Sequence, residues 1–301
     1  MLQSTEEYIK HLELENEALK EQNASQLSMY EMTTLYLKRL QEELRESEKN
    51  LIATNKKLTD SINYAKHIQD AFVVGHHSLQ QLIPESFILY LPKDIVSGDF
   101  VWTHQQGKSI YLGVGDCTGH GVPRAMLSIF VISMLNHIVS HFNVEDPVSI
   151  IRHLDRLVQE YVSNKTADSA ELAIIKYTPD EKTLVYAGAK RPLVQVCNGE
   201  IMVYKGARYT IGSPDRRIED VVNHIIHVKE ESMFYTFSDG YSDQFGGEND
   251  RKLNRKRLFT LLQHIAEKPL KTQKNNLAEV LLKWKGQIPQ TDDIVVTGLK
   301  I

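Results

Sequence analysis

The sequence predicts an α+β protein in which an antiparallel β-sandwich flanked by helices follows one long coiled-coil helix. Three features of the chain support this fold class. A seven-residue repeat runs without a slip from Leu2 to Phe72. After Pro84 the pattern changes to at least eight short strand-like runs, and helical periodicity appears in only four stretches. Because a helix does not follow each strand, two mainly antiparallel sheets with helices outside them are favoured over a parallel βαβ sheet.

The repeat defines two seams along the first helix. The first seam consists of Leu2, Ile9, Asn16, Asn23, Tyr30, Leu37, Leu44, Leu51, Leu58, Ala65 and Phe72. The second seam, three residues further on, consists of Thr5, Leu12, Leu19, Gln26, Thr33, Leu40, Ser47, Thr54, Ser61 and Ile68. A strict repeat of this length imposes a left-handed supercoil, and such a narrow seam cannot be buried without a partner helix. The sequence therefore predicts a dimer.

Polar residues within the seams refine this prediction. Asn16 and Asn23 can pair with their own copies only when two identical helices run parallel and in register. Ser47, Thr54 and Ser61 weaken the second seam, which suits a helix that has to shift or rotate. We interpret the segment as a parallel homodimeric coiled coil that acts as a signalling helix. The alternative is a long solvated helix that packs on its own domain.

The chain then divides into three parts. Residues 1–75 form the coiled coil, residues 76–84 a hinge, and residues 85–301 the globular domain. Gly75, His76 and His77 are expected to end the long helix. Neighbouring side chains point apart on a helix and no acidic residue lies at ligand spacing, so the two histidines are expected to be surface residues and not a metal site.

The globular part contains the predicted strands and the remaining helices. The strand-like runs are residues 87–91, 109–114, 172–175, 184–186, 193–196, 201–204, 233–237 and 294–297. Helical periodicity covers residues 125–141, 147–162, 256–266 and 273–284, and Pro147 suits the first turn of its helix.

The charge composition argues against proteins that bind or cleave nucleic acid. The 301 residues include 35 Lys+Arg and 39 Asp+Glu, for a net charge of −4, so there is no electrostatic reason to expect nucleic acid as a partner. A two-metal phosphodiesterase would need a basic groove that this composition does not show. The basic run at 251–257 is expected to be a solvated loop that leads into a helix, and contact with an acidic partner protein is the alternative.

Cysteine content and hydropathy indicate the compartment. Two cysteines, Cys117 and Cys197, cannot make a disulfide framework, and the N-terminus lacks the basic-then-apolar order of a signal peptide. No apolar stretch is expected to approach the roughly 20 residues needed to cross a bilayer. A reducing cytoplasm is the expected location, with no membrane contact by this chain.

Four aspartates stand where a strand ends in a turn: Asp99, Asp116, Asp239 and Asp292. An aspartate at the end of a strand beside a glycine, which lets another ligand approach, is an oxygen ligand for a hard cation such as Mg²⁺ or Mn²⁺. Several converging carboxylates repel one another unless cations neutralise them, and two cations about 3.5–4 Å apart can hold a hydroxide against phosphorus. The pattern predicts hydrolysis of a phosphate ester. The alternative, for any single aspartate, is ordinary turn chemistry.

The motifs around these aspartates occur in a fixed order: residues 92–100 (PKDIVSGDF), 114–123 (VGDCTGHGVP), 237–241 (FSDGY) and 291–294 (TDDI). They resemble the metal-dependent Ser/Thr phosphatases of the type 2C superfamily, specifically its bacterial SpoIIE/RsbU-like branch. The resemblance covers roughly Pro84 to the C-terminus, and residues 61–69 (SINYAKHIQ) are similar to the helix that precedes this domain in many members. It implies a type 2C-like αββα sandwich with two Mn²⁺ or Mg²⁺ ions.

The resemblance also implies roles for individual residues. Asp116 would bridge the two ions, and the Cys117 backbone carbonyl would bind one of them. Asp239 and Asp292 would bind the other, and Asp99 would complete the cluster directly or through water. Spacing alone leaves Asp292 and Asp293 open as the ligand, and the family pattern favours Asp292.

The chain departs from the family pattern in two places. Arg124 stands where many relatives have glycine, and residues 168–171 (DSAE) replace the family's Asp-Gly-Met-Asp, so the resemblance carries no accessory metal to that stretch. His120 is a candidate catalytic residue, because an imidazole with an ordinary pKa of about 6.5 can protonate a leaving serine alkoxide. The alternative is that His120, between two glycines, is a turn residue.

These features together predict a cytoplasmic, dimeric, metal-dependent protein serine/threonine phosphatase whose coiled coil receives the input. The resemblance implies that the substrate is a phosphorylated regulatory protein of the anti-anti-sigma type, and an upstream sensor protein is a further expected partner. The alternative from another class is a catalytically silent, dimeric module that binds a phosphoprotein without hydrolysing it.

Overall fold

The computed structural model describes residues 2–73, 76–163, 168–214, 217–228 and 231–301. Gly75, one of the residues expected to end the long helix, lies outside these ranges. In chain order the elements are α1 (Leu2–Phe72), α2 (His76–Leu82), β1 (Ser86–Leu91), β2 (Asp99–Gln106), β3 (Ser109–Cys117), α3 (Gly121–Ser140), α4 (Pro147–Val158), η1 (Gln159–Ser163), β4 (Ala170–Thr178), η2 (Pro179–Glu181), β5 (Thr183–Ala189), β6 (Leu193–Cys197), β7 (Glu200–Tyr204), η3 (Arg217–Asp220), β8 (His224–His227), β9 (Met233–Phe237), α5 (Gly240–Asp243), β10 (Phe245–Gly246), β11 (Arg251–Lys252), α6 (Arg255–Ile265), α7 (Leu270–Lys285) and β12 (Ile294–Lys300).

Two five-stranded antiparallel sheets form the centre of the globular part. One has the strand order β1-β12-β9-β6-β7 and the other β2-β3-β4-β5-β8, and every pairing within them is antiparallel. The predicted α+β fold class is confirmed, and each predicted strand is present. Within these two sheets the sequence missed β2 and β8, because the outer half of β2 is polar and β8 is a four-residue edge strand that begins and ends with histidine. It also missed the two-residue strands β10 and β11.

Strand alternation separates the two faces of each sheet. Along β3, Ile110, Leu112 and Val114 point between the sheets, into a core that also holds Val295 and Phe234 of the other sheet. The residues between them in the chain point to the opposite face of the sheet, where helices cover it. A residue placed two positions after Val114 therefore lies at the end of the space between the sheets.

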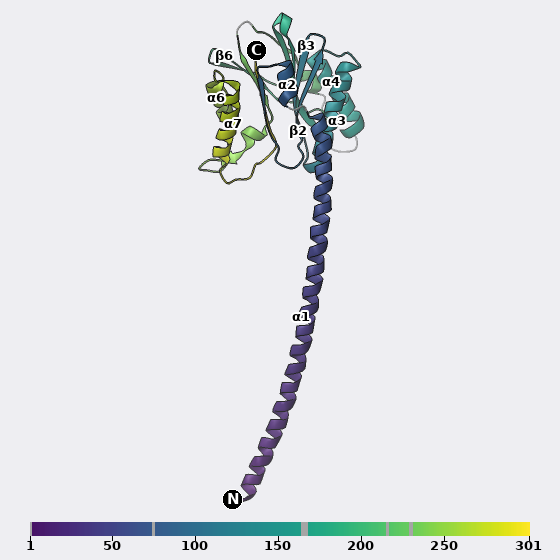
Figure 1. Ribbon diagram of the computed structural model, residues 1–301, viewed down its shortest axis with the longest axis vertical. Helices are drawn as coiled ribbons and strands as arrows, with labels where there is room; N and C mark the ends of the chain where they lie inside the picture. The colour runs from purple at the N-terminus through teal and green to yellow at the C-terminus, as the bar shows by residue number, and fades with distance from the viewer. Residues whose placement is uncertain (1, 74–75, 164–167, 215–216, 229–230) are drawn as a thin grey trace. The chain divides into compact units, whose positions relative to one another are not determined.

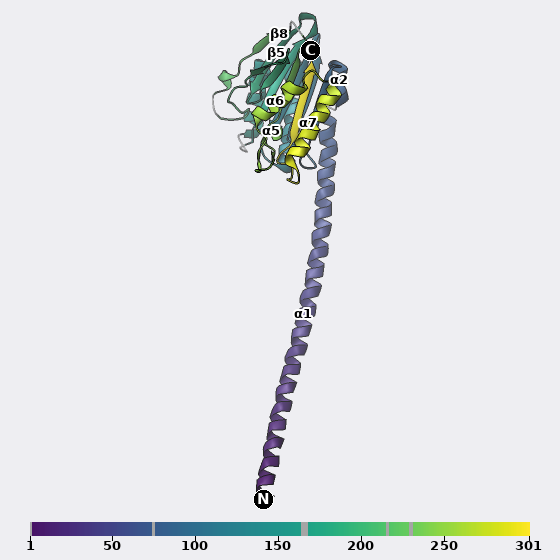
Figure 2. The ribbon, with the colours of Figure 1, turned by 90° about the vertical axis from the view of Figure 1, so that its left-hand side faces the viewer.

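Helices cover the outer face of each sheet and complete the four layers. Side chains of α3 and α4 pack on β2, β3, β4 and β5, and side chains of α6 and α7 pack on β1, β6, β9 and β12. Figure 1 shows these two helix pairs on opposite sides of the sheets. Figure 2, turned by 90°, shows α6 and α7 in front of the sheet that they cover. The helix α4 begins with Pro147 in its first turn, and the Asp146 side chain caps it by accepting from Ser149 N.

One helix of the described residues, α3, is long and apolar enough to cross a membrane by length and composition, contrary to the expectation that the chain has no such stretch. The prediction overlooked it because Arg124 and polar residues interrupt the apolar run in the sequence. In this structure α3 lies beside α4 on one sheet, and its side chains that face the sheet and α4 belong to the core.

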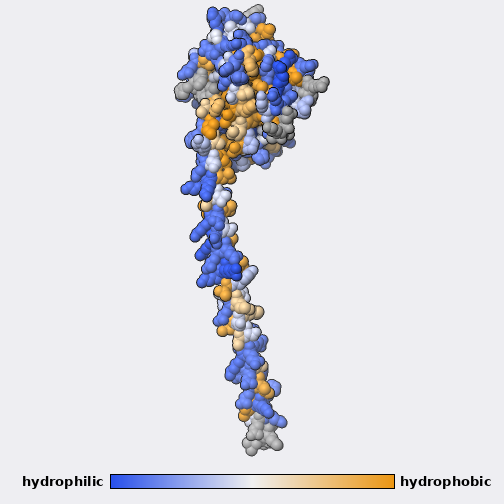
Figure 3. All heavy atoms as spheres, turned by 90° about the vertical axis from the view of Figure 1, so that its right-hand side faces the viewer, coloured by the Kyte–Doolittle hydropathy of each residue, from blue (hydrophilic) through white to orange (hydrophobic). Residues whose placement is uncertain are grey.

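The chain divides into a helical unit, residues 1–61, and a globular unit, residues 62–301. Leucines of the first seam lie exposed on the helical unit: Leu37, Leu44, Leu51 and Leu58 are 59–70% exposed. Figure 3 shows apolar side chains interrupting the polar surface at intervals along this helix. An apolar seam left in water calls for a partner, so the geometry is compatible with the predicted coiled coil.

The end of α1 belongs to the globular unit. Gln69 is buried there, and Val73 packs against the core beside α3. The segment 76–84, predicted as a hinge, contains the short helix α2, whose Leu79 is buried in the core between the sheets together with Ile83. The division at residues 75 and 84, and the role of this segment as a hinge, stay predictions.

Candidate metal centre

Three carboxylates form a row across one sheet. Asp99 on β2 lies opposite Asp116 on β3, and Asp116 lies opposite Glu171 on β4. Each stands two positions from a residue that points between the sheets, namely Val101, Val114 or Ala173. Alternation therefore directs all three carboxylates into the same end of the space between the sheets.

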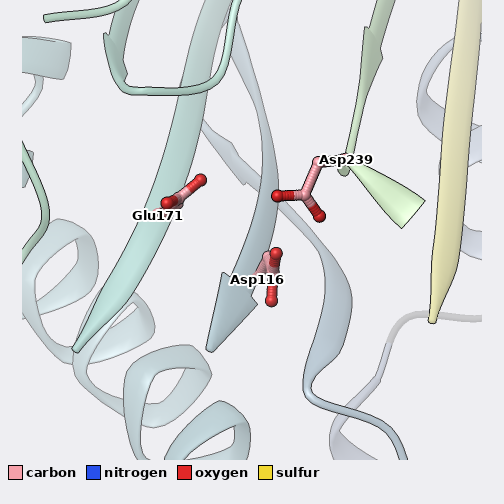
Figure 4. A group of neighbouring side chains, drawn as sticks. All are labelled: Asp116, Glu171 and Asp239. Carbon is pink, nitrogen blue, oxygen red and sulfur yellow. The ribbon is translucent and has the colours of Figure 1, made fainter. Parts of the chain in front are cut away.

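The fourth carboxylate comes from the opposite sheet. Asp239 lies two residues after the end of β9 and directly precedes α5. Its side chain meets Asp116 and Glu171, and one oxygen of each of the three lies within 4.8 Å of the others. Figure 4 shows Asp116 and Glu171 on neighbouring strands, with Asp239 pointing toward them from the end of a third. A cluster of three carboxylate oxygens is a donor set that a hard divalent cation can use.

Asp292 and Asp293 reach the site from the turn before β12, and they play different parts. The Asp293 carboxylate is buried and accepts from Lys93 N at 2.8 Å and from Gly98 N at 2.9 Å, so it holds the loop that leads to Asp99. The Asp292 carboxylate is 38% exposed and accepts from Arg124 Nη1 at 2.6 Å. Asp292 is thus the more open of the two, as the family pattern favours.

A buried arginine lies among the first group of carboxylates. Arg191 is 1% exposed and comes from the loop between β5 and β6, which joins the two sheets. Its Nη2 contacts Asp116 Oδ2, Glu171 Oε2 at 2.7 Å and Asp239 Oδ2 at 3.3 Å. Its Nε has no hydrogen-bond partner in the part of the chain that the structure describes. One guanidinium therefore contacts all three carboxylates.

A second arginine lies among the other group of carboxylates. Arg124, in the first turn of α3, donates from Nη2 to Asp116 Oδ1 at 2.6 Å and to Asp99 Oδ1 at 3.2 Å. Its Nε donates to the Cys117 carbonyl at 2.5 Å, and its Nη1 lies 3.3 Å from Asp293 Oδ2 in addition to its bond with Asp292. The two oxygens of Asp116 are therefore divided between the two arginines.

The turn between β3 and α3 brings these groups together. Gly119 has a φ of +105°, which residues with a side chain rarely adopt, and this lets the chain reverse directly after Asp116. Gly98 allows Arg124 to lie against the backbone, because a Cβ at residue 98 would overlap the Arg124 side chain. Gly119 is thus required by its backbone conformation, whereas Gly98 leaves the space that the Arg124 side chain occupies.

Burial makes the carboxylate cluster dependent on positive charge. Burial raises the pKa of Asp99 well above its ordinary value, the Asp116 carboxylate raises it further, and Ser238 and Arg124 lower it. Burial also raises the pKa of Asp116, while Arg191 and Arg124 lower it. Among the described residues, Asp99 Oδ2 is buried without a hydrogen-bond partner. Clustered acidic oxygens with one unused buried oxygen fit divalent cations, which prefer such ligands.

A small cavity opens beside the cluster. It has a volume of about 140 Å³ and is lined by Lys93, Asp94, Val96, Gly119, His120, Gly121, Arg124, Thr291, Asp292 and Asp293. His120 directly precedes α3, with extended backbone and an exposed side chain that makes no capping hydrogen bond to the described residues. It lies on the wall of the same cavity as Asp292 and Arg124, so the predicted proton donor and part of the predicted metal site share one opening.

The structure brings the predicted site residues together and groups them differently from the resemblance. Asp99, Asp116, Asp292 and the Cys117 carbonyl surround Arg124, whereas Asp239 lies with Arg191. Asp239 and Asp292, assigned to one ion by resemblance, thus belong to different groups. The ligand roles of these residues and the proton donation by His120 stay predictions.

Sequence reasoning missed three residues of the site: Glu171, Arg124 and Arg191. Glu171 ends the DSAE stretch that was set aside as a departure from the family pattern, although a glutamate there carries the same carboxylate as the family's aspartate. Arg124 was noticed as a departure without a role. Arg191 carried no motif signal, because only the loop between the sheets places it in the cluster.

Comparisons with known proteins agree with this site. The family model "Stage II sporulation protein E (SpoIIE)" matches residues 106–301. The SiaA-PP2C domain of Pseudomonas aeruginosa is 30% identical, with a TM-score of 0.76 over 83% of this chain and 99% of that chain. A comparison with curated proteins found no match.

Two further solved structures share the fold at lower identity. The RsbU and RsbW domains of Rv1364c from Mycobacterium tuberculosis are 18% identical, with a TM-score of 0.59 over 72% of this chain and 60% of that chain. RsbX in complex with magnesium is 16% identical, with a TM-score of 0.50 over 72% of this chain and 94% of that chain.

The two antiparallel sheets, their flanking helices and the acidic cluster between them define a metal-dependent phosphatase of the PP2C type. Within that class the chain belongs to the SpoIIE family. The prediction of a SpoIIE/RsbU-like phosphatase is therefore confirmed.

Proposed function

We propose that this chain hydrolyses phosphoserine and phosphothreonine on a regulatory protein partner, using two Mn²⁺ or Mg²⁺ ions. The observation that carries the proposal is that Asp116 belongs to two groups of carboxylates at once. Its two carboxylate oxygens face two separate groups of possible metal ligands. One group contains Glu171 and Asp239, and the other contains Asp99 and Asp292. A carboxylate that belongs to two groups of ligands can bind two neighbouring cations, as a two-cation site requires.

Different residues would bind the two cations and supply the proton. Asp116, Glu171 and Asp239 would hold one cation, and Asp116, Asp99, Asp292 and the Cys117 carbonyl the other. Bound cations supply the positive charge that activates the attacking water and neutralises the phosphoryl oxygens. His120, on the cavity wall, would give a proton to the serine or threonine oxygen as it leaves.

The position of the cavity supports a protein substrate. The cavity lies beside the cluster and is lined by Asp292 and His120, so a phosphorylated side chain would enter there while the remainder of the substrate lies outside on the surface. The family resemblance indicates a small phosphorylated regulator of the anti-anti-sigma type. The cytoplasm is the proposed place of action, because the sequence offers only two cysteines and no disulfide framework.

Phosphopeptide turnover with metal titration tests this proposal. We expect hydrolysis of a phosphoserine peptide to require Mn²⁺ or Mg²⁺ and to be lost in Asp239→Asn and Asp116→Asn, because an amide replaces a charged ligand by one neutral oxygen. Asp243→Asn is the matched control, since Asp243 stands on α5 and pairs with Lys252 at 2.7 Å. Turnover in excess chelator would rule out the metal mechanism. Tight binding of the phosphopeptide without turnover would favour the silent binding module.

We also infer that the coiled coil makes the protein a parallel homodimer and regulates the phosphatase, with an upstream sensor protein as the source of the signal. The exposed seam leucines support dimerisation. Regulation is supported by Gln69, near the end of α1, which is buried and donates from Nε2 to Ser97 O at 2.5 Å and to Ser128 Oγ at 3.0 Å. Its Oε1 accepts from Ser97 N at 3.0 Å.

These contacts join α1 to two segments that carry the site. Ser97 lies two residues before Asp99, and Ser128 lies about one helical turn after Arg124 on α3. A rotation or shift of α1 would therefore act on both segments through one side chain.

Replacement of Gln69 tests the regulatory proposal. We expect Gln69→Ala to shift the Mn²⁺ concentration for half-maximal turnover in the full chain, because the segments bearing Asp99 and Arg124 lose their common partner. His67→Ala is the control, since His67 is exposed on the same turn of α1. An unchanged Mn²⁺ titration for Gln69→Ala would contradict coupling through this contact.

A further inference from the structure

Arg124 binds the same atoms that the proposed metal centre would use. Its three donor nitrogens contact Asp116 Oδ1 at 2.6 Å, Asp292 Oδ1 at 2.6 Å and the Cys117 carbonyl at 2.5 Å. A fourth contact reaches Asp99 Oδ1 at 3.2 Å. These oxygens come from three segments of the chain, namely β2, the end of β3 and the turn before β12. One guanidinium therefore supplies the positive charge that would otherwise have to bind between them.

The guanidinium and a cation cannot occupy this position together. A divalent cation of the Mg²⁺ size requires about 2.1 Å to each ligand oxygen, which places it where the Arg124 nitrogens lie. Two positive groups at that separation would also repel strongly in a buried site. Cation binding among these oxygens therefore requires Arg124 to leave.

Arg124 has room to leave, in contrast to Arg191. Arg191 is 1% exposed and lies in the loop between the sheets, where its carbonyl accepts from Tyr186. The Arg124 side chain is 11% exposed and lines the cavity of about 140 Å³ that also reaches His120. A rotation of the Arg124 side chain toward this cavity would open the oxygens without a change in the backbone of α3.

We propose that Arg124 is a built-in competitor of the divalent cation and sets the cation concentration that the protein requires. In the metal-free protein its guanidinium neutralises Asp99, Asp116 and Asp292, and loading is an exchange in which the cation takes these oxygens and Arg124 turns into the cavity. The inference rests on the proposed metal centre and adds to it a residue that determines cation affinity.

Calorimetric titration of the chelator-treated full chain with Mn²⁺ alone tests the exchange without any substrate. We expect Arg124→Gln to bind Mn²⁺ about tenfold more tightly than the parent, because ion-paired hydrogen bonds no longer have to be broken. Gln keeps part of the stem and one donor for the Cys117 carbonyl. Arg124→Lys should fall between the two, since an ammonium cannot contact all the oxygens at once.

Lys93→Gln is the matched control. Lys93 lines the same cavity, but its Nζ donates to Thr291 O at 2.9 Å and not to the carboxylates. Removing it lowers the positive charge near the site by the same amount without vacating the oxygens. We expect Mn²⁺ affinity to change by less than about twofold in Lys93→Gln, since exposed charges are screened.

Thermal unfolding with and without Mn²⁺ shows whether a change in binding comes from a folding defect. Without metal, Arg124→Gln should melt at a lower temperature than the parent, because the carboxylates repel one another, and it should gain more from added Mn²⁺. Equal or weaker Mn²⁺ binding by a folded Arg124→Gln protein, or an equal gain in Lys93→Gln, would overturn the exchange while leaving the metal centre intact. Failure of both the parent and Arg124→Gln to bind Mn²⁺ would overturn the metal centre as well.

Discussion

At the scale of single residues, Asp116 is the centre of the cluster of buried charges. It is almost completely buried, yet both of its oxygens are used, one by Arg124 and the other by Arg191. A buried carboxylate is stabilised only when charge and hydrogen bonds compensate for its lost hydration. Arg124 and Arg191 provide this compensation, one on each side of Asp116, and the same two-sided environment suits two cations.

Glu171 is expected to be as important as the aspartates. In Glu171→Gln, Mn²⁺ affinity and phosphopeptide turnover should both fall by about 100-fold or more, because a charged oxygen of the cluster becomes neutral. Calorimetric titration and steady-state kinetics measure the two quantities. The control is Glu145→Gln. It removes a charge that pairs at 2.7 Å with Lys176, which lies on β4 as Glu171 does. Parent-like Mn²⁺ affinity in Glu171→Gln would show that Glu171 only pairs with Arg191.

The neighbours Asp292 and Asp293 should give opposite results. Asp292→Asn should weaken Mn²⁺ binding with little effect on stability, because its carboxylate is open and contacts Arg124. Asp293→Asn should lower the free energy of unfolding by about 1–3 kcal/mol, because an amide cannot accept from both Lys93 N and Gly98 N. Chemical denaturation and Mn²⁺ titration of both variants measure this contrast. The reverse pattern would assign the ligand role to Asp293.

At the scale of elements, strand ends and one helix start build the site. The carboxylates of β2, β3 and β4 lie in one row because the strands pair in register at their ends. The first turn of α3 adds Arg124, and the next turn holds Ser128, which Gln69 contacts. The element that begins at the metal site is thus also the element that α1 touches.

The weak part of the second seam is expected to control the rate. Replacing Ser47, Thr54 and Ser61 with leucine should stabilise the helix dimer by about 1–3 kcal/mol for each buried leucine and lock one packing of the two helices. The locked protein should show a shifted Mn²⁺ requirement or a changed turnover number. Thermal unfolding measures the first effect, and kinetics at several Mn²⁺ concentrations measure the second.

One control variant makes the seam experiment decisive. The same three leucines combined with Gln69→Ala should raise stability without shifting the Mn²⁺ requirement, because the contact to Ser97 and Ser128 is gone. A triple-leucine protein that is more stable yet kinetically identical to the parent would mean that the coiled coil dimerises the enzyme and does not regulate it.

At the scale of the whole molecule, the two units have separate tasks. The globular unit, residues 62–301, contains all three hydrophobic clusters of the described residues. The helical unit, residues 1–61, exposes its apolar seam and has no core of its own among its described residues. A helix of this kind gains stability from a partner and not from its own chain.

Removal of residues 1–61 should therefore leave a folded, monomeric phosphatase. The cut falls between the two units and keeps Gln69 in place, whereas a cut after Phe72 would remove a side chain that the globular unit buries. Light scattering over a range of concentrations measures the mass, and circular dichroism measures the fold. If the shortened protein stays dimeric when dilute, the main dimer interface lies in the globular unit.

The sequence by itself determined the parts of this protein that depend on local patterns. A period of seven predicted the long helix, a period of two predicted most of the strands, and aspartates beside glycines at strand ends predicted an acidic site. The resemblance of these motifs identified the family. Each of these signals lies within a few consecutive residues, where backbone geometry alone relates one side chain to the next.

Only the tertiary structure decided which charges meet. Arg191 and Asp116 are 75 positions apart, and Arg124 and Asp292 are 168 positions apart. The pairing of β3 with β4, which α3, α4 and η1 separate in the chain, puts Glu171 opposite Asp116. No local pattern specifies that register. The packing of two sheets against each other then encloses the carboxylates with two arginines, because buried charges of one sign are stable only where the fold supplies the other.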